Sequence, residues 1–257
     1  VKALLTEEGK KVQGVKCCGM PGEKTYDSAE EIDEDAGYYS LFIVSYKSRG
    51  ISADFIMRDE DGYMVYIVGA GPGAADLITV RGARLLKEAD VVIYAGSLVN
   101  PGLLKETKAG CRIYNSAVMT LEEVVDAIRE AEERGLMTVR LHTGDPCLYG
   151  AVREQMDAMD SLGIAYEVCP GVSSFCGAAA ALKMEYTLPG ISQSAVITRM
   201  AGRTPVPERE SIRSWAAHRS TMVIFLSAGL LGELSRELIA GGYERTDPAA
   251  IVYKATW

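Results

Sequence analysis

The sequence predicts an α/β fold made of two α/β domains with mostly parallel sheets. From Met64 onward, short apolar runs alternate with amphipathic stretches long enough to form helices. This alternation is typical of βαβ units, in which the strands pair in parallel. Glycine- or proline-containing loops follow several of the apolar runs, as expected where a strand turns into a helix. A Pro/Gly-containing break at Tyr186–Ser192 indicates a second domain, so we expect domains at 64–180 and 181–257.

Strands are expected where apolar residues form runs too short for helices. These are Val65–Gly69, Val91–Tyr94, Cys111–Tyr114, Leu136–His142, Ala165–Cys169, Ala195–Arg199, Thr221–Leu226 and Ala250–Tyr253. Helices are expected at Leu77–Ala89, Leu121–Arg134, Ala151–Leu162, Ser174–Met184, Glu208–His218 and Leu230–Ala240. The clearest helix is Leu121–Arg134, because Thr120 and Glu123 have capping-box spacing and Gly135 ends the pattern.

Residues 1–63 differ in character from the rest. Strands are expected at Lys11–Cys18 and Tyr38–Tyr46, with an acidic, solvated run at Ser28–Asp35 between them. The polar, glycine-containing residues 47–63 are expected to form a linker. So few apolar groups would make a marginal domain alone. Because the sequence begins with Val1 and ends inside an apparent strand at Trp257, we expect a fragment with an incomplete second domain.

Composition excludes several classes of function. The net charge is −8, from 27 basic and 35 acidic residues, whereas proteins that bind nucleic acids or anionic lipids need a basic face. No apolar run reaches the roughly 20 residues that span a membrane. The six cysteines form no C-x-x-C pair and only two histidines are present, so we expect no metal site, buried small cysteines and a reducing cytoplasmic location.

The first motif is the loop Gly69–Gly73, which follows a strand and precedes a helix. Glycines there let backbone approach a ligand, although a purely structural turn remains an alternative. The sequence argues against a dinucleotide site, because Pro72 removes an N–H that would cradle pyrophosphate. The acid expected at the end of the second strand is also replaced, by Tyr94-Ala95-Gly96-Ser97.

Three further motifs follow later strands. In Thr143-Gly144-Asp145-Pro146, the carboxylate of Asp145 either accepts hydrogen bonds from a cofactor or caps the following helix. In Cys169–Ser174, a serine either contacts a ligand or serves as a simple N-cap. Beyond Tyr186–Ser194, Arg199 either holds a carboxylate with its planar fork or forms a surface salt bridge. We find no hydrolase motif such as G-x-S-x-G.

Taken together, the ordered loops resemble one family. Val65–Gly73, Thr143–Pro146 and Pro170–Ser174, in this order and spacing, are similar to the tetrapyrrole methylases, the class III S-adenosylmethionine methyltransferases. Tyr94–Val99, Thr187–Pro189 and Ser192–Arg199 most resemble the branch that methylates C-11 of precorrin-4 or cobalt-precorrin-4. Where family members often have Asp-Pro, this chain has Ala74-Ala75, so we assign no role to an acid at position 74.

The resemblance implies an enzyme of cobalamin biosynthesis that is a cytoplasmic homodimer, binds S-adenosylmethionine in a cleft between two α/β domains, and acts on a tetrapyrrole. It implies cofactor contacts at Pro72, Thr143, Gly144, Asp145, Leu148, Ser173, Ser174, Leu226 and Ala255. Our candidates for the substrate are Tyr94, Ser97, Tyr149, Arg153, Tyr186 and Arg199. Direct displacement at the sulfonium methyl needs no nucleophilic side chain, and the sequence identifies no general base.

The sequence is also compatible with other functions. Methylation at C-17, at C-20 or on uroporphyrinogen III fits most of the same motifs. A nicotinamide-dependent oxidoreductase rests on the glycine loop alone, and a non-catalytic carrier of cofactor or tetrapyrrole is a third possibility. Residues 1–46 resemble the carboxyl-terminal end of C-20 methyltransferases that act on (cobalt-)precorrin-2, which implies a remnant of a second enzyme.

Overall fold

The computed structural model describes residues 12–16, 24–26, 40–44 and 65–257, and it divides into two compact units, Val1–Arg58 and Asp59–Trp257. The first unit contains an antiparallel sheet of order β2-β1-β3, with β1 at Val12–Lys16, β2 at Lys24–Tyr26 and β3 at Ser40–Val44. Strands β1 and β3 lie within the two expected strands, whereas β2 was not predicted. The expected acidic run and linker lie outside the described residues.

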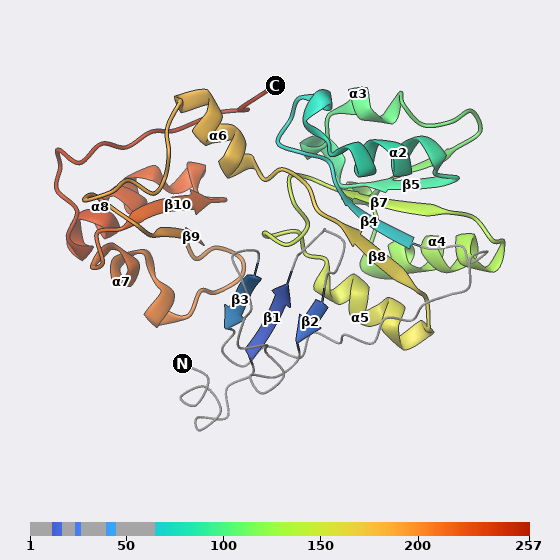
Figure 1. Ribbon diagram of the computed structural model, residues 1–257, viewed down its shortest axis with the longest axis horizontal. Helices are drawn as coiled ribbons and strands as arrows, with labels where there is room; N and C mark the ends of the chain where they lie inside the picture. The colour runs from blue at the N-terminus through green and yellow to red at the C-terminus, as the bar shows by residue number, and fades with distance from the viewer. Residues whose placement is uncertain (1–11, 17–23, 27–39, 45–64) are drawn as a thin grey trace. The chain divides into compact units, whose positions relative to one another are not determined.

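The second unit is built on a five-stranded parallel sheet of order β6-β5-β7-β4-β8 (Figure 1). Its strands are β4 at Val65–Gly69, β5 at Val91–Tyr94, β6 at Arg112–Asn115, β7 at Thr138–His142 and β8 at Tyr166–Cys169. These strands match the predicted positions to within a few residues. Because β7, β4 and β8 are neighbours, the loops that follow their carboxyl ends meet at one edge of the sheet.

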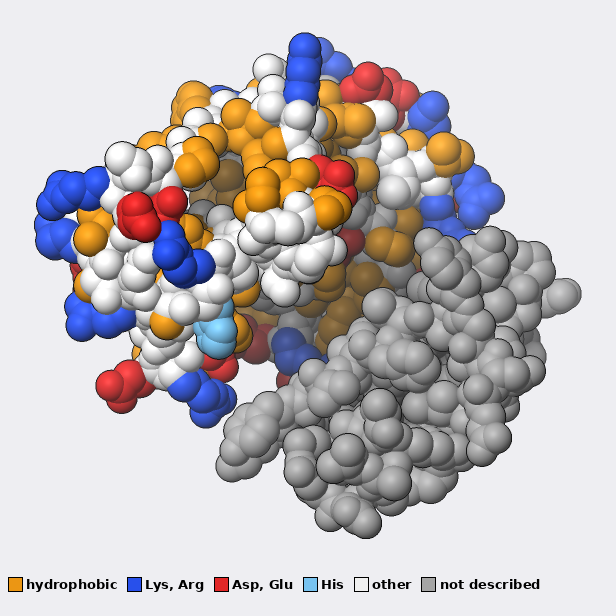
Figure 2. All heavy atoms as spheres, turned by 60° about the vertical axis from the view of Figure 1, so that its left-hand side comes forward, with side chains coloured by type: hydrophobic (Ala, Val, Ile, Leu, Met, Phe, Trp, Pro, Cys, Tyr) orange, Lys and Arg blue, Asp and Glu red, His pale blue; other side chains and the backbone are white. Residues whose placement is uncertain are grey.

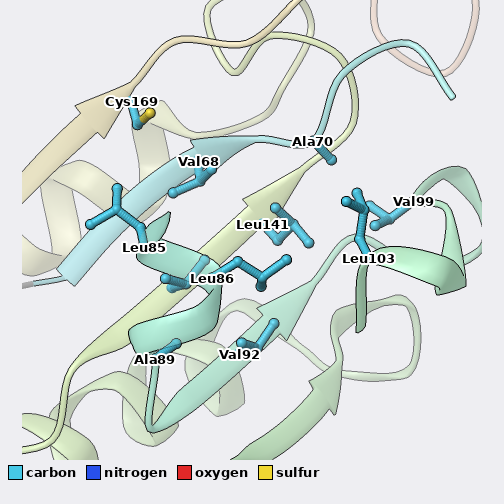
Figure 3. Packing of buried hydrophobic residues seen from close by; sticks show 11 residues of the cluster. Val68, Ala70, Leu85, Leu86, Ala89, Val92, Val99, Leu103, Leu141 and Cys169 are labelled. Carbon is cyan, nitrogen blue, oxygen red and sulfur yellow. The ribbon is translucent and has the colours of Figure 1, made fainter. Parts of the chain in front are cut away.

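Both faces of this sheet are covered by helices, which explains why its strands read as continuous apolar runs. On one face, Val68 and Leu141 pack against Leu85 and Leu86 of helix α2, Val80–Glu88 (Figure 3). On the other face, apolar strand residues pack against helix α4, Leu121–Glu133, through Ile128 and against helix α5, Arg153–Leu162, through Met159. The α/β class is therefore confirmed for this unit.

The helices of this unit are α2 at Val80–Glu88, α3 at Pro101–Leu104, α4 at Leu121–Glu133, α5 at Arg153–Leu162 and α6 at Ser174–Leu182. Short 3-10 turns lie at Ala75–Leu77 (η1), Gly96–Leu98 (η2) and Ser116–Val118 (η3). The predicted capping box of α4 is confirmed, since Thr120 and Glu123 bond each other's backbone N–H groups.

One expected helix, Leu77–Ala89, was wrong at its start. The backbone of Thr79 is extended, with φ −65° and ψ 152°, and its hydroxyl accepts a hydrogen bond from the N–H of Gly82. Thr79 is therefore an N-cap that begins α2, and it separates this helix from the η1 turn.

The carboxyl-terminal part contains a two-stranded parallel sheet of β9, Ala195–Arg199, and β10, Thr221–Phe225. Around it lie η4 at Glu208–Glu210, α7 at Ile212–Ala216, η5 at Ala228–Leu230 and α8 at Leu231–Gly241. The expected helix Glu208–His218 was wrong as a single helix, because Ser211 is extended and caps α7 through the N–H of Ser214.

The expected strand Ala250–Tyr253 was also wrong. No strand of the described residues pairs with it, and Ile251 and Tyr253 are 70% and 83% exposed. An apolar run forms a strand only where a neighbouring backbone offers hydrogen bonds. Separately, none of the helices in the described part of the chain has the length and apolar character needed to cross a bilayer.

Candidate cofactor and substrate site

The loops after β4 and β7 are joined directly through their backbones. Gly144 donates its N–H to the carbonyl of Gly71 at 2.9 Å, and Gly71 donates to the carbonyl of Gly144 at 3.2 Å. One residue earlier, the N–H of Ala70 bonds the carbonyl of His142 at 2.7 Å. The first two motifs found in the sequence therefore form one continuous rim at the carboxyl edge of the sheet.

Glycine is required where the loop after β8 meets this rim. A Cβ atom on Gly171 would lie 2.1 Å from the carbonyl oxygen of Gly144 and 2.7 Å from the Cα of Gly69. A Cβ atom on Gly69 would lie 2.5 Å from the Cα of Gly171. All these neighbours are backbone atoms, which cannot rotate away as a side chain can. The glycines thus allow three loops to pack closely, in addition to any approach of a ligand.

Asp145 fastens two of these loops with its carboxylate. One oxygen accepts the N–H of Cys147 at 2.8 Å, and the other accepts the N–H of Gly171 at 2.9 Å. The alternative in which Asp145 caps the following helix was wrong, because α5 begins at Arg153 with Val152 at its N-cap position. The side chain instead bridges the loops after β7 and β8 by charge-assisted hydrogen bonds.

Two hydroxyl-bearing residues on the same loops make no local capping bond. Thr143 Oγ1 is buried without a hydrogen-bond partner among the described residues. Ser173 is buried at the N-cap position of α6, but its side chain does not cap the helix as the simple alternative required. A buried hydroxyl without a partner costs about 1–3 kcal/mol. These loops therefore fit a polar ligand that supplies the missing partner.

The remaining cofactor candidates lie on several segments. Pro72 is buried against α6. A Cβ atom on Gly177 of this helix would lie 2.9 Å from the Cβ of Pro72, so this contact requires a glycine at position 177. Ala255 precedes Thr256, whose hydroxyl accepts the N–H of Ala74 at 3.1 Å. Leu226 follows β10, is exposed, and has a left-handed backbone with φ 54°. Leu148 and Ser174 are half-buried in the loop after β7 and at the start of α6.

The structure brings two substrate candidates, Tyr149 and Arg199, close together. The ring of Tyr149, from the loop after β7, lies 5.4 Å from the ring of Phe225 at the end of β10. Burial raises the pKa of Tyr149, and the positive charge of Arg199 partly offsets this rise. Tyr149 has a left-handed backbone with φ 54°, a strain of about 1–3 kcal/mol that is common at functional sites.

Of the two expected roles of Arg199, the surface salt bridge was wrong for the described residues, and the contact with a substrate carboxylate stays a prediction. Its guanidinium donates to the backbone carbonyls of Met200, Thr204 and Pro205 at 3.1 Å. A surface salt bridge of Arg199 is not found within the described ranges. Its present role is to hold the loop that follows β9.

The other substrate candidates lie on three segments of the fold: the start of α5, the segment after α6, and the end of β5 with the η2 turn. Arg153 begins α5 and pairs with Asp157 and Asp160 of its own helix. Tyr186 donates its hydroxyl to the carbonyl of Phe175 at 2.7 Å. Tyr94 ends β5 and is half-buried, whereas Ser97 is exposed within η2.

Sequence reasoning missed two buried polar residues on β7, Arg140 and His142. His142 is 3% exposed, and its Nε2 atom has no hydrogen-bond partner among the described residues. Burial lowers the pKa of His142 to about 3, and the positive charge of Arg140 acts in the same direction. The imidazole is therefore neutral in the folded protein.

The buried His142 predicts a stability loss in mild acid. The unfolded chain binds a proton on this imidazole below pH about 6.5, whereas the folded chain does not until pH about 3. The contribution of the buried neutral imidazole to the free energy of unfolding is therefore present above pH about 6.5. This contribution is lost as the pH falls, at up to about 1.4 kcal/mol per pH unit. Urea unfolding of wild type and His142→Gln across this range measures the effect. Equal pH slopes for the two proteins would show that the prediction is wrong.

Comparisons with known proteins place this α/β fold and its glycine-lined rim in one family. The model of the Tetrapyrrole (Corrin/Porphyrin) Methylases matches residues 64–257. The cobalt-precorrin-4 C(11)-methyltransferase of Methanocaldococcus jannaschii is 53% identical over 193 residues, or 75% of this chain and 74% of that protein. The precorrin-4 C(11)-methyltransferase of Mycobacterium tuberculosis is 45% identical over 194 residues, or 75% and 77%. The chain therefore belongs to the tetrapyrrole methylase family.

Solved structures agree with this assignment. The X-ray structure of a cobalt precorrin-4 methyltransferase is 46% identical, has a TM-score of 0.74, and covers 76% of this chain and 81% of that one. A uroporphyrin-III C-methyltransferase from Thermus thermophilus, complexed with S-adenosylhomocysteine, is 27% identical with a TM-score of 0.58, covering 70% and 73%. The chain is an S-adenosylmethionine-dependent methyltransferase, and the nicotinamide alternative is excluded.

The unpartnered hydroxyl of Thr143 gives a direct test of the cofactor site. Thr143→Val keeps the side-chain shape and removes the hydroxyl. Because this hydroxyl bonds nothing in the described chain, we expect unchanged or slightly higher thermal stability, together with roughly tenfold weaker binding of S-adenosylhomocysteine. Calorimetric titration and thermal unfolding measure the two effects. Wild-type affinity in the variant would remove Thr143 from the site.

Proposed function

We propose that this chain transfers a methyl group from S-adenosylmethionine to C-11 of precorrin-4 or cobalt-precorrin-4, in cobalamin biosynthesis. The observation that supports this most strongly is 53% identity to a C(11)-methyltransferase over 193 residues. The uroporphyrinogen-III C-methyltransferase of Bacillus subtilis is more distant, at 34% identity, and this chain covers 41% of it. The C-11 position is therefore favoured over other ring positions.

We assign the cofactor to the rim formed by the loops after β4, β7 and β8, together with the segments that follow β10 and precede the end of the chain. The proposed contacts are Pro72, Thr143, Gly144, Asp145, Leu148, Ser173, Ser174, Leu226 and Ala255. When bound, the cofactor supplies an electrophilic methyl group. Asp145 keeps two loops in register, and the buried hydroxyl of Thr143 is available to orient a polar group of the cofactor.

The tetrapyrrole is assigned to the side of this rim that carries Tyr149. Tyr94, Ser97, Tyr149, Arg153, Tyr186 and Arg199 are the proposed substrate residues. The contact of Tyr149 with Phe225 joins the loop after β7 to the second sheet and would exclude water beside the reacting carbon. Positioning of two reactants in this way supplies roughly 7–11 kcal/mol of a barrier, so the reaction needs no nucleophilic side chain.

Mass spectrometry tests the proposed reaction. The full chain is incubated with cobalt-precorrin-4 and S-adenosylmethionine that carries a deuterated methyl group. The expected product is the tetrapyrrole with one labelled methyl, formed together with S-adenosylhomocysteine. Release of S-adenosylhomocysteine without a labelled tetrapyrrole, or binding without turnover, would contradict the proposal. Metal-free precorrin-4 run in parallel distinguishes the two substrates.

We also propose a cytoplasmic homodimer with domains at 64–180 and 181–257. The change from the five-stranded to the two-stranded sheet between β8 and β9 supports this domain division.

The free thiols of Cys111, Cys147, Cys169 and Cys176 fit a reducing compartment. Hydrophobic side chains gather over the middle of the face in Figure 2, and an apolar surface of this kind is typical of an association site.

A further inference from the structure

Arg140 is a buried cation whose hydrogen-bond partners among the described residues are all neutral. It lies on β7 and is 6% exposed. Its guanidinium donates to Gln155 Oε1 at 2.8 Å, to the carbonyl of Ile93 at 3.0 Å and to Ser116 Oγ at 3.1 Å. Burial lowers its pKa to about 10, so it remains charged at neutral pH. A buried charge without an opposite charge is unfavourable and calls for a specific role.

Gln155 and Ser116, which accept hydrogen bonds from Arg140, each donate a hydrogen bond to a backbone carbonyl near the carboxyl edge of the sheet. Gln155 donates from Nε2 to the carbonyl of Ala151 at 3.0 Å, and Ser116 donates to the carbonyl of Tyr94 at 3.0 Å. Ala151 is strained, with φ 49°, and it closes the loop that carries Tyr149. A bond to its carbonyl therefore fixes a backbone that would relax without it.

The cofactor rim is held by different means. Gly69, Gly144 and Gly171 pack backbone against backbone, and Asp145 joins the loops after β7 and β8. Within the described part of the chain, the hydrogen bonds of Arg140 and Gln155 go to other residues than these. Different hydrogen bonds thus support the rim and the Ala151 end of the loop after β7, so we expect a change at Gln155 to affect tetrapyrrole binding more than cofactor binding.

We propose that Gln155, oriented by Arg140, is a positioning residue for the tetrapyrrole, because it holds the strained loop that presents Tyr149 to the substrate. The inference rests on the proposed function and extends it to a specific support of the substrate side. Gln155 does not touch the reacting atoms. Its effect passes through the carbonyl of Ala151 to the position of the Tyr149 ring.

Gln155→Glu tests this role while preserving the fold. The carboxylate keeps the oxygen that accepts from Arg140 and adds an opposite charge beside it, but it lacks the amide donor that bonds Ala151. We expect an undiminished melting temperature, S-adenosylhomocysteine affinity within about twofold of wild type, and a KM for cobalt-precorrin-4 raised about tenfold. Arg140→Lys, which cannot reach all three partners, should raise the same KM and also lower the melting temperature.

The measurements distinguish a failure of this inference from a failure of the proposed function. Glu154→Gln, an exposed change on the same helix, is the matched control and should behave as wild type. Wild-type turnover with an unchanged KM in Gln155→Glu would overturn the inference alone. An equal loss of cofactor affinity and of tetrapyrrole affinity would also overturn it, since that pattern indicates a general structural role. Wild-type protein that neither binds nor methylates the tetrapyrrole would overturn the proposed function together with the inference.

Discussion

Replacing Gly171 by alanine is expected to abolish cofactor binding and to destabilise the unit that spans Asp59–Trp257. The added Cβ atom would lie 2.1 Å from the carbonyl oxygen of Gly144 and 2.7 Å from the Cα of Gly69. Both contacts are to backbone, so the loops after β4, β7 and β8 must separate. Overpacking of this kind costs about 1–3 kcal/mol or more. We expect S-adenosylhomocysteine affinity to fall beyond detection in a calorimetric titration and the melting temperature to drop by several degrees.

Gly202→Ala is the matched control for this substitution. A Cβ atom on Gly202 would have none of the described residues within 4 Å, and the Gly202 backbone is not in the left-handed region. The control should therefore retain wild-type stability and cofactor affinity. If Gly171→Ala also binds the cofactor as wild type does, the close packing of the three loops is not required for the site.

Asp145→Asn is expected to give the second largest effect. The asparagine retains one acceptor oxygen, but its amide NH₂ would face either the N–H of Cys147 or the N–H of Gly171, both of which now donate to the carboxylate. Loss of one hydrogen bond to a charged acceptor costs about 1.5–3 kcal/mol. We therefore expect S-adenosylmethionine affinity to fall by a factor of about ten or more, with a smaller loss in kcat once the cofactor is saturating.

The contribution of Asp145 is separated from a general charge effect by Asp126→Asn. Asp126 is an exposed residue of α4 that pairs with Arg129, and such surface pairs contribute little. This control should match wild type in cofactor affinity. Equal affinities for Asp145→Asn and the control would show that the bridge between the loops is dispensable.

Much of the fold follows from local sequence patterns. The strands of the five-stranded sheet were predicted because each is a short apolar run between polar loops, and α4 was predicted from its capping box. The errors came from features that depend on neighbours in space. Thr79 caps α2 where the apolar pattern predicted a continuous helix. Ala250–Tyr253 has strand-like residues but no partner strand among the described residues.

The loops of the site were found because parallel strands bring their carboxyl ends to one edge. Their internal chemistry was less predictable. Asp145 could be assigned to a helix cap or to a ligand, and its bridge from Cys147 to Gly171 depends on the packing of β7, β4 and β8. A signal for Arg140 was present, since a charged residue stands in the apolar run between Val139 and Leu141.

The central claim is the transfer of a methyl group to C-11, and ¹³C NMR of the product tests it most directly. The full chain is incubated with cobalt-precorrin-4 and S-adenosylmethionine whose methyl group is ¹³C-labelled. We expect a single enriched methyl signal that correlates with C-11 of the ring. An enriched methyl at C-17, at C-20 or at another ring carbon would contradict the assignment of position, and the absence of any enriched tetrapyrrole would contradict the activity itself.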